Sequence, residues 1–127
     1  MTKVLSIDDS STLRKIIGGT VSRLGFEFLE AEHGQAALDK LEGEYQNVSL
    51  ILLDWNMPVM DGIQTLEALK ADTRYKNIPV IMVTTESEKT NVVKAIQTGA
   101  KNYLTKPFNQ EELATRILEC LGMEVRY

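Results

Sequence analysis

The sequence predicts an α/β fold, with five parallel strands in one doubly wound sheet and helices on both of its faces. Two observations predict this class. Short apolar runs alternate with segments whose apolar residues recur every three or four positions, a pattern typical of consecutive strand–helix units. Two of the runs, Val48–Leu53 and Val80–Val83, are almost entirely apolar, as expected of strands that are covered on both faces.

The first half of the chain holds two complete strand–helix units. Val4–Ile7 is the first predicted strand, and a helix follows from Ser11, because apolar residues with helical spacing come after it. Gly25 suits the left-handed residue that commonly ends such a helix. Phe26–Ala31 is a half-buried second strand, and a second helix that ends near Gly43 buries Ala37, Leu38 and Leu41.

The middle of the chain continues the same plan. After the third strand, Val48–Leu53, a helix opens at Gly62 and buries Ile63, Leu66 and Leu69. Pro79 begins the fourth strand, because proline is tolerated at the first position of a strand.

A fourth helix and a last strand–helix unit complete the chain. The fourth helix carries Val92, Val93 and Ile96 and stops at Gly99, and the fifth strand is Asn102–Thr105. Asn109 caps the final helix, with Glu112 placed three residues later as in a capping box.

The composition describes one acidic domain. The chain has 127 residues, and 14 Lys and Arg against 18 Asp and Glu give a formal net charge of -4, which disfavours nucleic acid as a partner. Single domains commonly have roughly 100–150 residues, so no second folded unit is expected. Cys120 is the only cysteine, which excludes an internal disulfide and a zinc module. No apolar run approaches the roughly 20 residues of a membrane span, and no signal peptide is present, so a cytoplasmic location is expected.

Polar residues stand directly after four of the five predicted strands. They are Asp8-Asp9, Asp54, Thr84-Thr85 and Lys106-Pro107. Because the carboxyl ends of parallel strands meet at one edge of the sheet, these side chains are expected to line one cleft. Three carboxylates this close stay ionised together only with a cation between them, and oxygen ligands of this kind favour Mg²⁺.

These strand-end residues and their neighbours resemble a known family. The resemblance covers the whole chain and is to the receiver domain of two-component response regulators, within it to the stand-alone regulators of chemotaxis. It implies the flavodoxin-like strand order 2-1-3-4-5. The motifs that carry it are Asp8-Asp9, Asp54-Trp55-Asn56-Met57-Pro58, Met60-Asp61-Gly62, Val83-Thr84, Gly99-Ala100, Tyr103 and Lys106-Pro107-Phe108.

The resemblance implies a set of metal ligands. Asp9 and Asp54 would bind Mg²⁺ through their carboxylates and Asn56 through its backbone carbonyl, while Asp8 would act through water. Asp54 would also be the phosphoacceptor, because its carboxylate can attack phosphorus once nearby cations neutralise the developing charge.

The resemblance also implies a switch. Lys106, joined to Pro107 by a cis peptide bond, would pair with the phosphoryl group, and Thr84 would donate its hydroxyl to it. Two such charge-assisted bonds at ~1.5–3 kcal/mol each supply roughly 3–6 kcal/mol. Inverting a two-state equilibrium from 1:99 to 99:1 takes about 5.5 kcal/mol. Tyr103 would turn into the space that Thr84 leaves, and the partner surface would include Lys89, Val92, Ile96 and Tyr103.

The function implied is that of a single receiver domain, residues 1–127, without an output domain. A sensor histidine kinase of the chemotaxis type would phosphorylate it, and a flagellar motor switch protein or another phosphorylation-dependent partner would bind it, with a phosphatase as a further partner. It would be a monomer that catalyses only its own phosphorylation and dephosphorylation. The alternative is a phosphorelay intermediate or phosphate sink.

Two enzyme or ligand-binding alternatives are disfavoured. Aspartyl phosphohydrolases place a second acid two positions after the nucleophile, where Asn56 stands and cannot act as a general acid or base. The glycine-rich motifs of nucleotide-binding domains are absent from the sequence.

Three further residues have weaker interpretations. His33 has no partner spacing and is interpreted as a loop residue, and Cys120 is interpreted as a neutral helix thiol. Thr85 stands where chemotaxis regulators commonly have Ala or Gly. Its branched side chain is expected to restrict Tyr103 or access to the phosphoryl group.

Overall fold

The structure is a computed structural model that describes residues 2–123 of the chain. Five strands form one sheet in the order β2-β1-β3-β4-β5, and every neighbouring pair is parallel. The predicted fold class and strand order are therefore confirmed. The strands are β1 (Lys3–Ile7), β2 (Glu27–Ala31), β3 (Val48–Leu53), β4 (Val80–Thr84) and β5 (Asn102–Thr105).

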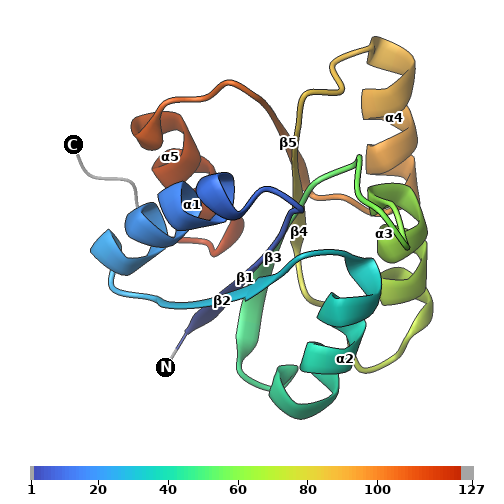
Figure 1. Cartoon of the computed structure of the whole chain (residues 1–127), viewed down its shortest axis with the longest axis horizontal. Coiled ribbons are helices and arrows are strands. Elements are labelled where there is room, and N and C mark those ends of the chain that lie inside the picture. Colours follow the sequence, from blue (N-terminus) through green and yellow to red (C-terminus); the bar gives the residue numbers. More distant parts are fainter. Residues whose placement is uncertain (1, 124–127) are drawn as a thin grey trace.

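Helices cover both faces of the sheet (Figure 1). α1 and α5 lie on one face, and α2, α3 and α4 lie on the other. No helix within residues 2–123 combines the length and apolar character that crossing a membrane requires. The helices are α1 (Ser11–Arg23), α2 (Gly34–Glu44), α3 (Gly62–Ala71), α4 (Lys89–Thr98) and α5 (Gln110–Cys120).

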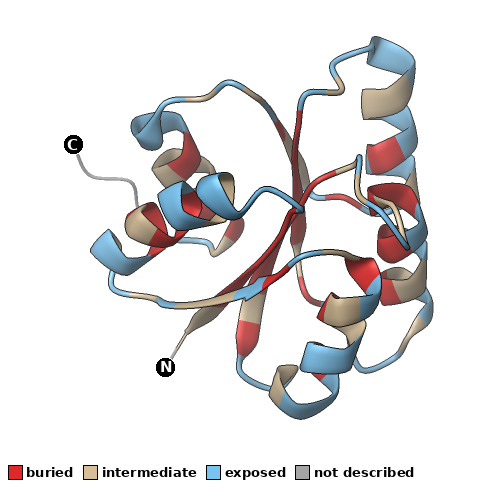
Figure 2. Cartoon of the chain, viewed as in Figure 1, coloured by how far each residue is buried: buried red, intermediate tan, exposed pale blue. Residues whose placement is uncertain are grey.

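The sheet separates two apolar cores, which Figure 2 shows as buried residues along the strands and the inner helix faces. Successive strand residues point to opposite faces. On β3, Leu50 and Leu52 pack with residues of α1 and α5, whereas Ile51 and Leu53 pack with residues of α2, α3 and α4. Both cores therefore continue to the carboxyl ends of the strands, where the predicted site residues stand.

Local differences from the sequence prediction lie at element ends. β2 begins at Glu27 rather than Phe26, because the Phe26 amide donates to Val21 and still belongs to the end of α1. α2 ends at Glu44, near Gly43 as predicted, and its C-cap Tyr45 has right-handed geometry that needs no glycine.

Helix capping also differs in part from the prediction. His33 lies in the loop before α2, as predicted, and in addition caps that helix, since its Nδ1 accepts a hydrogen bond from the Ala36 amide at 3.1 Å. Asn109 caps α5 as predicted, by accepting from the Glu112 amide. A capping box with both reciprocal bonds occurs at the start of α3, between Asp61 and Gln64.

Candidate functional site

Three carboxylates meet at the carboxyl end of the sheet. Asp8 and Asp9 follow β1, Asp54 follows β3, and one carboxylate oxygen of each lies within 4.8 Å of the others. Asp8 and Asp54 are buried, with 2% and 7% of their surface exposed, while Asp9 is exposed. This is the convergence that adjacent parallel strands impose on residues far apart in the sequence.

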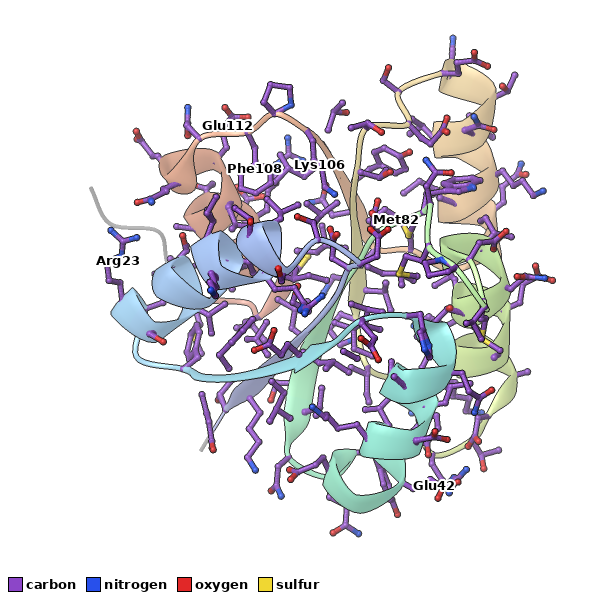
Figure 3. All side chains as sticks on the ribbon, viewed as in Figure 1. Arg23, Glu42, Met82, Lys106, Phe108 and Glu112 are labelled. Atoms are coloured by element: carbon purple, nitrogen blue, oxygen red, sulfur yellow. The ribbon has the colours of Figure 1, made fainter. Side chains whose placement is uncertain are left out.

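Lys106 provides positive charge to this cluster. Its Nζ lies 2.8 Å from Asp8 Oδ2 and 3.4 Å from Asp54 Oδ2. The residue stands on the segment between β5 and α5 (Figure 3), and its amide donates to the Thr84 carbonyl at 2.9 Å. The peptide bond from Lys106 to Pro107 is cis. One cation thus partly balances three carboxylates, and the cluster keeps an excess of negative charge.

The environment of Asp54 reflects this excess. Burial raises the pKa of its carboxyl above the usual 3.8, and the neighbouring Asp8 carboxylate raises the pKa further. Lys106, the Thr84 hydroxyl and the Trp55 amide lower the pKa, but they do not reverse the shift. The Trp55 amide donates to Asp54 Oδ1 at 2.8 Å. Without a further cation, the folded chain therefore holds the Asp54 proton more tightly than the unfolded chain does.

A pH dependence follows from the raised pKa of Asp54. Because the folded state binds this proton more tightly, the stability that Asp54 contributes is present below pH ~4 and is lost as the pH rises through its raised folded pKa. The free energy of unfolding of Asp54→Asn minus that of the wild type should therefore increase toward neutral pH in the absence of Mg²⁺. Urea unfolding of both proteins from pH 4 to pH 8 measures this difference, and a flat difference would contradict it.

The cluster fits a divalent oxygen-seeking cation. Its donors are carboxylate oxygens, which Mg²⁺ prefers, and their mutual repulsion is relieved by a second positive charge beside Lys106. Asn56 stands on the exposed segment between β3 and α3, and its side-chain amide donates to Glu86 Oε1 at 3.2 Å. The part of its backbone carbonyl in metal binding stays a prediction.

Gly62 lets the start of α3 approach the end of β3. A Cβ at this position would lie 2.3 Å from the Asp54 carbonyl oxygen and 2.7 Å from Trp55 Cα, closer than side-chain carbons come to backbone atoms. The Gly62 amide donates to the Trp55 carbonyl at 2.7 Å. Gly62 therefore packs directly against the backbone of Asp54 and Trp55, and a residue with a side chain does not fit at this position.

The segment between β3 and α3 contains a strained turn. Val59 has φ of 66°, which is unusual for a β-branched residue, and its side chain is 77% exposed. The Met60 amide donates to the Pro58 carbonyl at 2.7 Å across this residue, as in a γ-turn. Backbone strain is common beside functional sites, and this turn lies between Asp54 and the capped start of α3.

Glu86 connects the predicted switch residues. Its amide donates to Thr84 Oγ1 at 3.3 Å, and its carbonyl accepts from the Tyr103 hydroxyl. Its carboxylate also accepts from the side-chain amides of Asn56 and Asn91, each at 3.2 Å. Thr84, the segment before α4 and the β5 tyrosine are thus joined through one residue.

Tyr103 is half-buried and packs against the core beneath α2, α3 and α4. Burial, and then the nearby Glu86 and Asp54, raise its pKa to about 12. The hydroxyl therefore stays protonated at neutral pH and can donate to the Glu86 carbonyl.

Of the predicted partner-surface residues on α4, Lys89 and Ile96 are exposed and Val92 is half-buried.

Thr85 lies on the opposite side from Tyr103. It lines an apolar groove of about 440 Å³ together with Lys106 and residues from the start of α1, whereas Tyr103 packs on the other face of the sheet. The expectation that Thr85 restricts Tyr103 was therefore wrong, because Thr85, which follows the last residue of β4, faces the start of α1 on the other side of the sheet. Its effect on access to the site stays a prediction. The remaining lining residues are Leu13, Ile16, Pro107 and Phe108.

Comparison with known proteins identifies the family. The model of the response regulator receiver domain matches residues 4–118. The chain belongs to the response regulator receiver family. This receiver domain is 46% identical over 121 residues to chemotaxis protein CheY1 of Helicobacter pylori, covering 94% of this chain and 97% of that relative.

Solved structures agree with this assignment. The receiver domain matches chemotaxis protein CheY4 of Vibrio cholerae with a TM-score of 0.88 and 34% identity, covering 94% of this chain and 98% of that one. It matches CheY in a CheX–CheY–BeF3–Mg complex from Borrelia burgdorferi with a TM-score of 0.88 and 29% identity, over 93% of this chain and 87% of that one. Together they make this receiver domain a CheY-like response regulator of chemotaxis type.

The structure brings together most of the residues that the sequence singled out. Asp8, Asp9, Asp54 and Lys106 form one cluster, and Thr84 and Tyr103 meet through Glu86. Sequence reasoning missed that Glu86 links these residues, because two of its four partners, Asn56 and Tyr103, lie far from it in the sequence. The sequence placed Gly62 at a helix start, but it did not predict how closely Gly62 approaches the Asp54 backbone.

Proposed function

We propose that this receiver domain is switched by transfer of a phosphoryl group from a sensor histidine kinase to Asp54, in a reaction that requires Mg²⁺. The observation that carries the proposal is the buried Asp54 carboxylate, set between two further carboxylates and a lysine at the carboxyl edge of the sheet. Asp54 can act as the nucleophile, and its environment supplies the groups that phosphoryl transfer needs.

The chemistry uses residues of this chain in distinct parts. An Asp54 oxygen attacks phosphorus and forms an acyl phosphate, while the bond from phosphorus to the kinase histidine breaks and its electron pair stays on that nitrogen. Bound Mg²⁺ would neutralise charge on the transferring oxygens, with Asp9, Asp54 and the Asn56 carbonyl as its ligands and Asp8 acting through water. Lys106 would leave its carboxylate partners to pair with the phosphoryl group.

The switch would run from Thr84 to Tyr103. A phosphoryl oxygen on Asp54 would accept a hydrogen bond from the Thr84 hydroxyl and draw it toward the site, whereas in the structure the Thr84 oxygen accepts from the Glu86 amide. Movement of Thr84 would release the segment that also holds Tyr103, because both bonds end on Glu86. The surface formed by Lys89, Val92, Ile96 and Tyr103 would change with that segment and alter its affinity for a partner.

The biological setting of the proposal follows from the chemotaxis relatives. The kinase would be of the chemotaxis type, and the partner a flagellar motor switch protein or another protein that binds the phosphorylated form, with a phosphatase ending the signal. We further propose that the chain acts as a cytoplasmic monomer and turns over no separate substrate. That residues 1–127 form a single receiver domain without an output domain stays a prediction.

The test uses acetyl phosphate as a small phosphoryl donor and Trp55, beside Asp54, as the reporter. Adding both Mg²⁺ and acetyl phosphate to the wild type should change Trp55 fluorescence and increase the protein mass by one phosphoryl group. The Asp54→Asn variant should show no such increase in mass. Asp39→Asn is the matched control, because it removes an exposed carboxylate on α2. A phosphoryl mass retained by Asp54→Asn would reject Asp54 as the acceptor.

A further inference from the structure

Arg14 joins two strands behind the carboxylate cluster. The residue lies on α1, and only 14% of its side chain is exposed. Its Nη1 donates to the Asp8 backbone carbonyl at 2.5 Å, and its Nε donates to Glu30 Oε1 at 2.6 Å. Glu30 lies on β2, directly beside the end of β1 in the sheet register. One guanidinium therefore ties the segment after β1 to the neighbouring strand.

The Asp8 carbonyl belongs to the peptide unit that leads into Asp9. The other polar atoms of Asp8 are held by other residues: its amide donates to Ala31, Oδ1 accepts from the Ser10 amide, and Oδ2 accepts from Lys106. Arg14 supplies the bond to the carbonyl. The orientation of the Asp8–Asp9 peptide plane thus depends directly on Arg14.

Asp9 has little else to hold it. Within residues 2–123, no hydrogen bond or ion pair holds its exposed carboxylate, although one of its oxygens lies within 4.8 Å of oxygens from Asp8 and Asp54. Its direction is consequently set through its backbone. Residues that orient a metal ligand without touching the metal commonly alter metal affinity when they are replaced.

We propose that Arg14 is a positioning residue for Mg²⁺, which aims the Asp9 carboxylate by holding the Asp8–Asp9 peptide plane. This inference rests on the magnesium site of the proposed function. It differs from an effect of charge, and the two effects have opposite signs. A guanidinium near the cluster repels Mg²⁺, so removing it for charge alone would tighten binding, whereas loss of positioning weakens binding.

Mg²⁺ titration followed by Trp55 fluorescence separates these effects, without acetyl phosphate and well below the melting temperature. Arg14→Met should weaken Mg²⁺ binding about tenfold. Arg14→Lys keeps the charge, but an ammonium lacks the planar guanidinium that bonds the Asp8 carbonyl and Glu30 together. This variant should therefore also weaken Mg²⁺ binding. Arg23→Met, at the far end of α1 from Lys106 (Figure 3), removes the same charge and should bind Mg²⁺ like the wild type.

Glu30→Gln provides a second, milder change if Arg14→Met fails to fold. It keeps an acceptor for Arg14 but removes the charge that fixes the guanidinium, and should weaken Mg²⁺ binding less than Arg14→Met does. The amide resonance of Asp9 should shift in Mg²⁺-free Arg14→Met and Glu30→Gln, and stay unchanged in Arg23→Met. Unchanged or tighter Mg²⁺ binding in Arg14→Met would overturn the positioning role. If only Glu30→Gln folds, an unchanged Asp9 amide resonance would overturn it, because losing the Glu30 charge by itself also weakens the attraction of Mg²⁺. A wild type without any Mg²⁺ response would overturn the magnesium site itself and this inference with it.

Discussion

Replacing Lys106 with methionine should lower the free energy of unfolding by about 3 kcal/mol at neutral pH in the absence of Mg²⁺. The lysine lies within 3.4 Å of two buried carboxylates, Asp8 and Asp54, and methionine leaves both without a counter-charge. Urea unfolding at pH 7 measures the loss. The deficit should shrink at low pH, where the carboxylates take up protons, and on adding Mg²⁺, which restores positive charge.

The control for Lys106→Met is Lys15→Met, which removes an exposed lysine from α1. Exposed charges contribute little to stability, so this variant should unfold within about 0.5 kcal/mol of the wild type. If Lys106→Met lost no more stability than Lys15→Met, the ion pairs of Lys106 would make no net contribution to the free energy of unfolding. Acetyl phosphate should still modify Asp54 slowly in Lys106→Met, but the phosphorylated variant should not gain affinity for a partner.

Replacing Gly62 with alanine should destabilise the fold by on the order of 3 kcal/mol and weaken Mg²⁺ binding by at least about tenfold. The added Cβ would meet the Asp54 carbonyl and Trp55 Cα, which are backbone atoms and cannot rotate away. Either α3 or the end of β3 must then shift. Urea unfolding and Mg²⁺ titration, both with Trp55 fluorescence, measure the two effects on the same protein.

Gly43→Ala is the matched control for this substitution. Gly43 lies within α2, and a Cβ there meets nothing within 4 Å. Alanine is the better helix residue, so Gly43→Ala should raise stability by about 0.5–1 kcal/mol and leave Mg²⁺ binding unchanged. A Gly62→Ala protein that matched the wild type in both measurements would show that the strand end can yield at no cost.

The sequence was sufficient to predict the class of the fold and the edge at which the site lies. Apolar periodicity separates strands from helices, and the strand-end rule places Asp8, Asp54 and Lys106 at one edge of the sheet. Periodicity does not specify which strands are neighbours, because every strand–helix unit looks alike. The order 2-1-3-4-5 therefore came from the family resemblance.

The features that were missed depend on contacts between distant segments. The contacts of Glu86 with Asn56 and Tyr103 join parts of the chain that no local pattern connects. The side on which Thr85 lies did not depend on distant contacts. Continuing the alternation of strand residues one position past Thr84 already places Thr85 away from Tyr103. The cap from His33 was missed because histidine is not among the residues usually preferred at that position.

The division of the interior has a consequence for how this site could be tuned. Leu52 and Leu53, the last two residues of β3, belong to different cores, and Asp54 comes directly after both. Both interiors therefore converge on the backbone of the phosphoacceptor candidate. Substitutions deep in either interior, far from any ligand, offer separate routes to adjust the same carboxylate, so that evolution can alter its chemistry while conserving every residue that lines the cleft.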